Sequence, residues 1–163
     1  MRSELIFGLD SSKQSNSFNR TRITGSTGLS GFSEMKEEGL LHSALTERII
    51  NCYYNVYNKL RYGFMEKIYE NAMLIELKKE RLKAESQKRI EVLYEGSVVG
   101  EYFADIVVED LVILELKAAE RICPEHSYQL LNYLKATDIE VGLLLNFGRK
   151  PEFVRKTFLN IHK

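Results

Sequence analysis

The chain has no excess of either charge, because 23 Lys and Arg residues balance 23 Asp and Glu residues among its 163 positions. A protein that binds nucleic acid mainly through phosphate contacts usually carries a basic excess. The balance therefore argues against a coat-type nucleic-acid binder, although it leaves room for an enzyme with a local basic rim.

Cysteine is scarce, with Cys52 and Cys123 only, and no CxxC pair. This pattern indicates reduced thiols and a cytoplasmic location. A zinc site made from these cysteines and His126 would lack a fourth ligand and the usual ligand spacing.

Long hydrophobic runs are also missing. No apolar stretch reaches the roughly 18 residues that a membrane-spanning helix requires, and the N-terminus has no hydrophobic signal core. Neither a Gly-rich phosphate loop nor a GxSxG nucleophile motif occurs. We expect no membrane partner, and 44% hydrophobic content is enough for the core of one domain.

Residues 1–34 are rich in Ser, Thr, Asn and Gly and show no sustained periodicity. Such a segment buries too little apolar surface to offset the entropy lost on ordering. We predict a disordered extension over 1–34 and a single domain over 35–163.

Two helices are predicted first. Apolar residues recur at helical spacing from Ser43 to Leu60, with Ser43 or Thr46 as the N-cap, and again from Phe64 to Leu82. Gly63 breaks the pattern between them, which indicates a tight turn at 61–63.

Strand patterns follow over 89–95, 98–108 and 111–118, then a helix over 124–136 and a buried strand over 140–147. The last three elements form a right-handed crossover unit. The predicted fold class is α/β, with a mixed four-stranded sheet flanked by helices in the order helix, helix, three strands, helix, strand. The basic segment 148–163 could add a short strand or a helix.

The stretch 103–117 carries three ionisable residues, Asp105, Glu115 and Lys117, in an otherwise mostly apolar setting. Burying charge costs several kcal/mol or more unless the charge is paired or holds a metal. Because side chains alternate along a strand, Glu115 and Lys117 share one face. Together with Asp105 they would suit Mg²⁺ or Mn²⁺, with Lys117 managing a water or a phosphate.

Whether Asp105 shares that face depends on the hairpin loop. A two-residue loop, with 108 opposite 111, would turn Asp105 away from Glu115. An odd loop, such as 108–110 with 107 opposite 111, would place Asp105 opposite Ile113 and diagonal to Glu115. The metal site therefore requires an odd loop or a bulge.

Taken alone, the D-x9-ExK pattern is weak, since many unrelated strands would satisfy it and an ion-paired lysine with two strand-edge carboxylates is the more common explanation. Glu66 falls in the first turn of the second helix, where the helix dipole favours a carboxylate, and Tyr69 shares its face. His126, Gln129 and Tyr133 form a polar stripe on the helix that follows the Glu115–Lys117 strand, within reach of the same site.

The segment 63–69, GFMEKIY, resembles the signature of the GxxExxY proteins, a branch of the PD-(D/E)xK nuclease superfamily. The similarity continues through 100–120, which contains Asp105 and Glu115-Leu116-Lys117, and through QLLNYL and GLLLNFG, so it covers about 35–155. Arg61-Tyr62 stands where the family usually has Gly-Pro.

The resemblance implies a restriction-endonuclease-like core and assigns roles to individual residues. Asp105 and Glu115 would hold a divalent metal, with the Leu116 backbone carbonyl and Glu66 as further ligands. Lys117 would position the attacking water, and Gln129 would orient Lys117 or the phosphate. Tyr69, His126 and Tyr133 are candidate substrate-binding residues.

These observations predict a Mg²⁺- or Mn²⁺-dependent nuclease acting on DNA or RNA, with DNA preferred. One alternative is a module that keeps the fold and binds nucleic acid or protein without turnover, and another is an enzyme acting on a small phosphate ester. The neutral charge favours a homodimer or a protein partner that completes the DNA-gripping surface.

Overall fold

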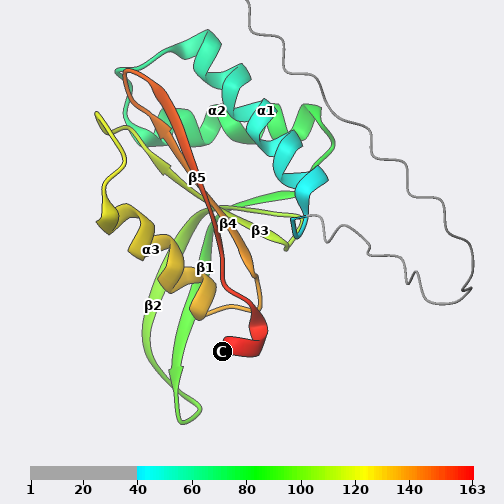
Figure 1. Cartoon of the computed structure of the whole chain (residues 1–163), viewed down its shortest axis with the longest axis vertical. Coiled ribbons are helices and arrows are strands. Elements are labelled where there is room, and N and C mark those ends of the chain that lie inside the picture. The colour runs from blue at the N-terminus through cyan, green and yellow to red at the C-terminus, as the bar shows by residue number, and fades with distance from the viewer. Residues whose placement is uncertain (1–39) are drawn as a thin grey trace, which may run out of the picture. The chain divides into compact units, whose positions relative to one another are not determined.

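The computed structural model describes residues 40–163, so the predicted disordered extension lies outside the described residues. The described chain forms three α-helices, five strands and a short C-terminal 3-10 helix (Figure 1). In chain order they are α1 Ser43–Leu60, α2 Glu66–Lys79, β1 Ala84–Tyr94, β2 Ser97–Val108, β3 Val112–Lys117, α3 Pro124–Lys135, β4 Val141–Phe147, β5 Pro151–Thr157 and η1 Asn160–His162.

The five strands form one mixed sheet in the order β1-β2-β3-β4-β5. Neighbouring strands are antiparallel except for β3 and β4, which are parallel and joined by α3, as the crossover predicted. The sheet has one strand more than the four that were predicted. The additional strand is β5, whose sequence does not distinguish a strand from a helix because it is polar, basic and partly exposed along its length, with no apolar alternation.

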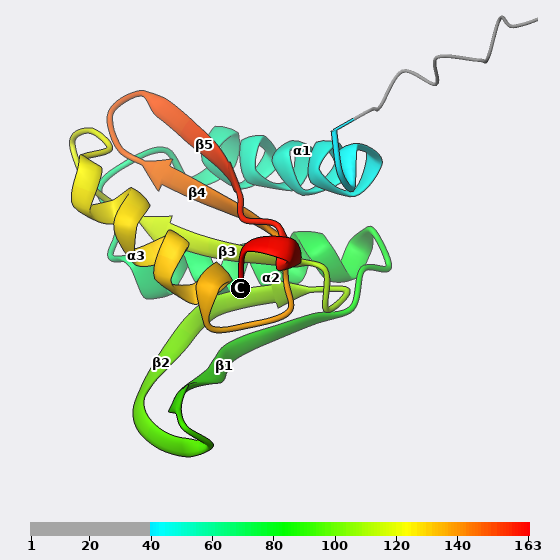
Figure 2. The same ribbon diagram turned by 60° about the horizontal axis from the view of Figure 1, so that its bottom comes forward.

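Helices cover both faces of the sheet, α1 and α2 on one face and α3 on the other (Figure 2). β3 shows how the sequence separates the two sides. Val112, Leu114 and Leu116 pack toward α1 and α2, whereas Ile113 packs toward α3. Glu115 and Lys117 alternate with these residues and therefore lie on the α3 face.

The bounds of α1 agree with the predicted helix, but its cap does not. His42 is the N-cap and makes no side-chain capping bond, while the Thr46 hydroxyl donates to the Ser43 carbonyl from within the first turn. Ser43 and Thr46 are therefore not caps, because both already lie inside the helix.

No helix in the described part of the chain is long and apolar enough to cross a membrane.

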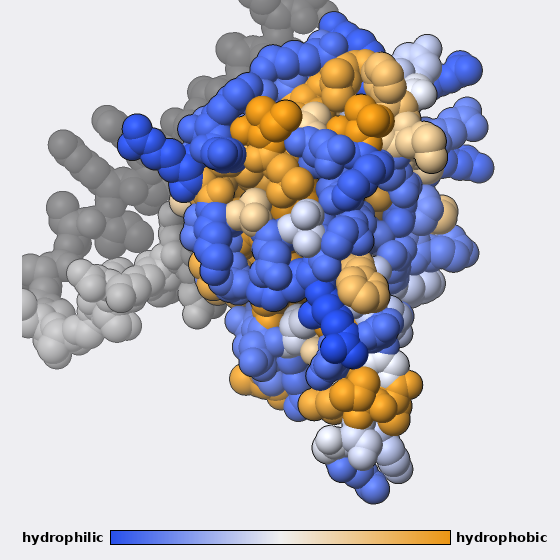
Figure 3. All heavy atoms as spheres, turned by 180° about the vertical axis from the view of Figure 1, so that it is seen from behind, coloured by the Kyte–Doolittle hydropathy of each residue, from blue (hydrophilic) through white to orange (hydrophobic). Residues whose placement is uncertain are grey.

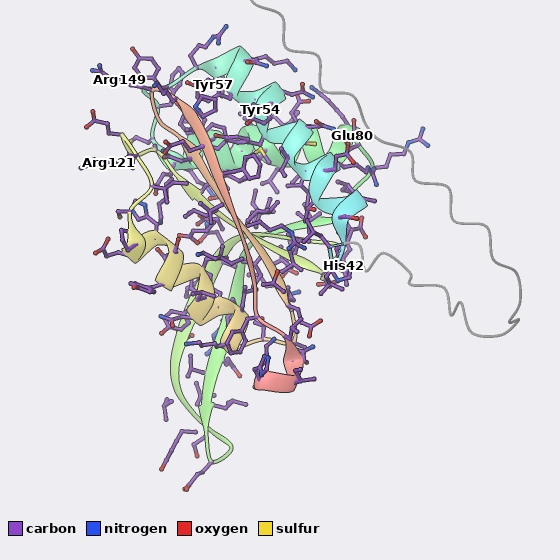
Figure 4. The ribbon with its side chains drawn as sticks, in the orientation of Figure 1. His42, Tyr54, Tyr57, Glu80, Arg121 and Arg149 are labelled. Carbon is purple, nitrogen blue, oxygen red and sulfur yellow. The ribbon has the colours of Figure 1, made fainter. Side chains whose placement is uncertain are left out.

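α1 also anchors the turn between β4 and β5. The Tyr57 hydroxyl contacts the carbonyls of Gly148 and Arg149, at 3.1 and 2.8 Å, and the Tyr53 hydroxyl donates to the Asn146 carbonyl. Figure 4 shows Tyr57 and Arg149 at the same end of the molecule. The buried face of α1 thereby holds the carboxyl end of β4 in place.

The β1–β2 hairpin extends beyond the rest of the sheet as a two-stranded arm (Figures 1 and 2). Its register shifts between Val92 and Leu93, which indicates a bulge near the tip. Apolar side chains gather at this tip, as Figure 3 shows from behind. The exposed apolar residues there are Leu93, Val98 and Val99.

Candidate active site

The hairpin between β2 and β3 has a three-residue loop, Glu109–Leu111, so the predicted odd loop is confirmed. Its register differs from the predicted one, since Val108 pairs with Val112. No pair is formed beyond Ile106–Leu114, so Asp105 is not opposite Ile113. Ile106 packs toward α1 and α2 but Ala104 packs toward α3, so the alternation of β2 breaks at Asp105, and the negative charge of Asp105 acts on Glu115.

The β2–β3 ladder ends at the pair Ile106–Leu114. Beyond it, the Leu116 N–H donates to Asp105 Oδ2 at 2.8 Å, so the aspartate takes the place of a backbone acceptor. The N–H and C=O of one strand residue point to the same side. The Leu116 carbonyl, a predicted metal ligand, therefore also points toward β2 where the ladder has stopped.

Glu115 is the most deeply buried member of the site, at 1% exposure. Its Oε1 accepts a bond from Lys117 Nζ at 2.6 Å, and the Lys117 side chain is only 15% exposed. Its Oε2 is one of two buried side-chain atoms in residues 40–163 that have no hydrogen-bond partner. Half of this carboxylate is thus desolvated without compensation.

Burial and charge shift the pKa values of the cluster. Burial, helped by the negative charge of Asp105, raises the pKa of Glu115 to about 7. Burial also raises the pKa of Asp105, although the bond from the Leu116 N–H opposes that rise. For Lys117, burial acts to lower the pKa, but the bond and charge of Glu115 outweigh it and the net change is upward.

Glu66 reaches this group from the first turn of α2. Its Oε1 accepts a bond from the Ala118 N–H at 3.3 Å, immediately after Lys117. Its negative charge acts to raise the pKa values of Asp105 and Glu115. The structure therefore places Glu66 beside the end of β3, on the side of α2.

The donor set suits a hard divalent cation, since Glu115 offers a buried oxygen without a partner and Asp105 lies beside it. No group of three or more His, Cys, Asp or Glu side chains within residues 40–163 is arranged to hold a metal by itself. Mg²⁺ usually takes one or two carboxylates and completes its shell with water and phosphate oxygens. Two carboxylates with the Leu116 carbonyl fit that requirement, and Glu66 stays a predicted further ligand.

Two predicted residues reach the neighbourhood of the site from α3. Gln129 Nε2 donates to the Tyr133 hydroxyl at 2.6 Å, and no bond joins Gln129 to Lys117 among the described residues. Tyr133 is nearly buried, and burial together with the charges of Glu115 and Asp105 raises its pKa. These two side chains form a polar pair next to the carboxylates.

His126 and Tyr69 have other contacts. His126 Nδ1 accepts the Cys123 N–H at 3.3 Å and completes the capping interaction at the start of α3. Tyr69 is fully buried and stacks on Phe147, with ring centroids 4.2 Å apart. Tyr69 presents no surface to a substrate and acts within the core.

The sequence reasoning missed a second carboxylate on α2. Glu70 is 4% exposed, and its charge acts to raise the pKa of Asp105. Lys67 Nζ and Gln87 Nε2 donate to it at 2.6 and 2.9 Å. Its spacing of four residues from Glu66 was the available signal, because such residues share a helix face.

A buried clamp behind the site was also missed. Asn146, fully buried in β4, pairs with the backbone of Ala119, whose N–H donates to Oδ1 and whose carbonyl accepts from Nδ2, both at 3.0 Å. A Cβ on Gly148 would lie 2.2 Å from the Ala119 carbonyl oxygen, so only glycine allows this approach. The clamp fixes the backbone that leaves Lys117.

The sheet is mixed and has helices on both faces, and its central strands β2 and β3 carry Asp105, Glu115 and Lys117. Comparison with known proteins identifies the class of protein that has this fold and this site. The model of the PD-(D/E)XK nuclease superfamily matches residues 43–156, more than half of the chain. The chain belongs to this superfamily, and its fold is consistent with the restriction-endonuclease-like core.

Among solved structures, the chain is similar to the crystal structure of SSO0001, with a TM-score of 0.47 and 20% sequence identity. The match covers 72% of this chain and 60% of that chain. No curated protein matches this sequence. The class assignment therefore rests on the superfamily match.

Proposed function

We propose that this protein is a Mg²⁺- or Mn²⁺-dependent nuclease that hydrolyses phosphodiester bonds. The observation that carries the proposal is the buried Glu115 carboxylate, which lies beside Asp105, contacts Lys117 and leaves Oε2 without a partner. Lys117 pairs only with Oε1, so the buried charge on Oε2 is costly unless a metal binds there. Membership of the nuclease superfamily supports nuclease activity as the reason that the buried carboxylate is present.

In this proposal Asp105 and Glu115 hold the metal, with the Leu116 carbonyl and Glu66 as further oxygen donors. A bound divalent metal lowers the pKa of a coordinated water and offsets charge on the phosphate. Lys117 Nζ, 2.6 Å from Glu115 Oε1, holds the attacking water or stabilises charge on a phosphate oxygen. The Gln129–Tyr133 pair supplies hydrogen-bonding groups on the α3 side.

We further propose that the chain falls in the GxxExxY branch, because 63–69 carries that spacing and Tyr69 supports the loop before Glu66. DNA is the proposed substrate and the cytoplasm the proposed location. The neutral net charge supports a homodimer or a protein partner that supplies additional basic surface.

The test is cleavage of labelled single-stranded DNA, duplex DNA and RNA by the purified chain in Mn²⁺ and in Mg²⁺. Lys117→Ala should slow cleavage by about 100-fold or more, in line with loss of a group that manages a proton or a water. Lys78→Ala is the matched control, since Lys78 is exposed on α2 and forms no ion pair within residues 40–163.

A panel left intact in both metals would overturn the nuclease proposal. Equal cleavage by wild type and Lys117→Ala would also count against it, since the activity would then not come from this site. Nucleic-acid binding that persists in EDTA without any cleavage would instead support a non-catalytic binding module.

A further inference from the structure

Three large apolar side chains are exposed on the short loop Arg61–Met65 between α1 and α2. Tyr62, Phe64 and Met65 expose 54%, 49% and 80% of their surface. Clustered apolar side chains in water mark binding surfaces more often than isolated ones do. This loop immediately precedes Glu66, so the exposed group lies next to the candidate metal site.

Two adjoining hollows connect the loop to that site. One, of ≈ 300 Å³, is lined by Tyr62 and Arg149 among others, and one, of ≈ 560 Å³, by Phe64 and Glu66 among others. Both share Gly63 and Ala118. Ala118 follows Lys117 directly and donates its N–H to Glu66. A chain lying in these hollows would pass Glu66 and the residue that follows Lys117.

The loop is held in one conformation before any ligand binds. The Tyr69 hydroxyl donates to the Arg61 carbonyl at 2.8 Å and accepts the Phe64 N–H at 3.2 Å. The Phe64 and Tyr69 rings meet edge to face at 6.2 Å. Because this support is buried, the exposed rings form a preorganised surface that loses little entropy on binding.

Unpaired basic side chains lie on the loop and near the first hollow. Arg149 lines that hollow together with Glu120, Arg61 begins the loop, Lys150 follows Arg149, and Arg121 lines a separate hollow. Arg61, Arg121, Arg149 and Lys150 are exposed, and none of them forms an ion pair within residues 40–163. The Arg149 guanidinium lies 6.0 Å from the Tyr62 ring. Figure 4 shows Arg121 and Arg149 at one end of the molecule. These unpaired basic side chains suit a phosphate backbone even though the whole chain is neutral.

The form of nucleic acid follows from the rings and the depth of the site. In a duplex the base faces are stacked on one another, so they are not available to Tyr62 and Phe64. Unpaired bases stack on aromatic side chains regardless of sequence. Glu115 and Lys117 are recessed, with side chains 1% and 15% exposed, and a flexible single strand reaches such a site more easily than a stiff duplex does.

We propose that the loop Arg61–Met65 is a stacking platform for unpaired bases, and that the chain acts on single-stranded nucleic acid. The cleavage part of this inference rests on the proposed nuclease function, whereas the binding part does not. Tyr62 and Phe64 contact bases, Arg149 contacts the backbone, and Tyr69 is a positioning residue that acts through the loop.

Binding is measured with the full chain carrying Lys117→Ala, so that substrate stays intact. Fluorescence anisotropy compares a labelled oligonucleotide as a single strand and annealed to its complement, for DNA and for RNA. Tyr62→Ala and Phe64→Ala should each weaken single-strand binding about fivefold or more, because stacking contributes about 1–3 kcal/mol per base. Tyr62→Phe should retain the affinity because it keeps the ring.

Tyr94→Ala is the matched control, since Tyr94 is 65% exposed at the tip of the β1–β2 arm, away from the loop. Thermal melts check folding, and if Phe64→Ala lowers the melting temperature, the Tyr62 variants decide the test.

Duplex binding as tight as single-strand binding, or affinity within twofold of the parent for Tyr62→Ala, overturns the proposed stacking platform. Wild type cleaving duplex as fast as single strands overturns the inference but not the nuclease. Single-strand binding that depends on Tyr62, with no cleavage in Mn²⁺, supports the platform while the nuclease proposal fails.

Discussion

Replacing Glu115 by Gln should make the metal-free protein more stable at alkaline pH, although it removes a candidate catalytic residue. The Glu115 carboxylate is buried beside Asp105, and its Oε2 has no partner. A glutamine side chain at this position would occupy nearly the same volume without a charge. The destabilising ionisation would therefore be absent from Glu115→Gln at every pH.

The size of the effect follows from the pKa of Glu115, which rises from 4.5 to about 7 in the folded state. Because the folded pKa is the higher one, ionisation favours unfolding as pH increases, and the cost is complete above about pH 7. A shift of this size corresponds to about 3 kcal/mol at alkaline pH, of which about 2 to 3 kcal/mol develops between pH 5 and pH 8.5.

The assay is urea unfolding of wild type and Glu115→Gln across that pH interval in EDTA. The difference in unfolding free energy between the two proteins should shift in favour of the variant by about 2 to 3 kcal/mol from pH 5 to pH 8.5. Comparing the change with pH removes the constant cost of altering the contact to Lys117. Glu47→Gln, at an exposed position of α1, is the control and should show no such trend.

A pH-independent difference between wild type and Glu115→Gln would refute the reasoning. It would mean that Glu115 ionises as easily in the folded as in the unfolded chain, so the carboxylate would not be desolvated. The same result would weaken the physical case for a metal at this position.

Further outcomes follow from the same structure. Mg²⁺ or Mn²⁺ should raise the melting temperature of wild type more than that of Glu115→Gln at alkaline pH, and equal shifts would argue against Glu115 as a ligand. Arg61 has φ 59° and ψ −162°, a region that only glycine adopts easily. Arg61→Gly should therefore stabilise the fold by about 1 kcal/mol in urea unfolding, after the entropic cost of glycine, and a loss of stability would contradict the strain. Gly148→Ala should destabilise by about 1–3 kcal/mol because its Cβ would lie 2.2 Å from the Ala119 oxygen, while Gly100→Ala, with no atom within 4 Å, should not show this clash cost.

The family resemblance singles out Arg61, since Arg61-Tyr62 stands where the family usually has Gly-Pro. The structure gives that departure a physical meaning, because Arg61 and Gly63 both have positive φ, at 59° and 111°. The loop tolerates an arginine at this position because the Tyr69 hydroxyl donates a hydrogen bond to the Arg61 carbonyl. The motif tyrosine, expected to bind substrate, is buried and supports this loop.

The sequence by itself determined the helices, most of the strands and the shared strand face of Glu115 and Lys117. Periodicity of 3.6 or 2 is a local property, so it located α1, α3 and most strand positions, and it put Glu115 and Lys117 on one face. The parity of the hairpin loop could be stated as a requirement from the same local rule. These features depend on residues close together in the chain.

Tertiary structure decided what depends on distant residues. The bond from the Leu116 N–H that holds Asp105, the edge strand β5, and the clamp between Asn146 and Ala119 all involve separate segments. Glu70 gained its place beside Asp105 only when α2 packed on the sheet. Pairing and packing between elements carry no local signature, so the surroundings of the site emerge only in the folded chain.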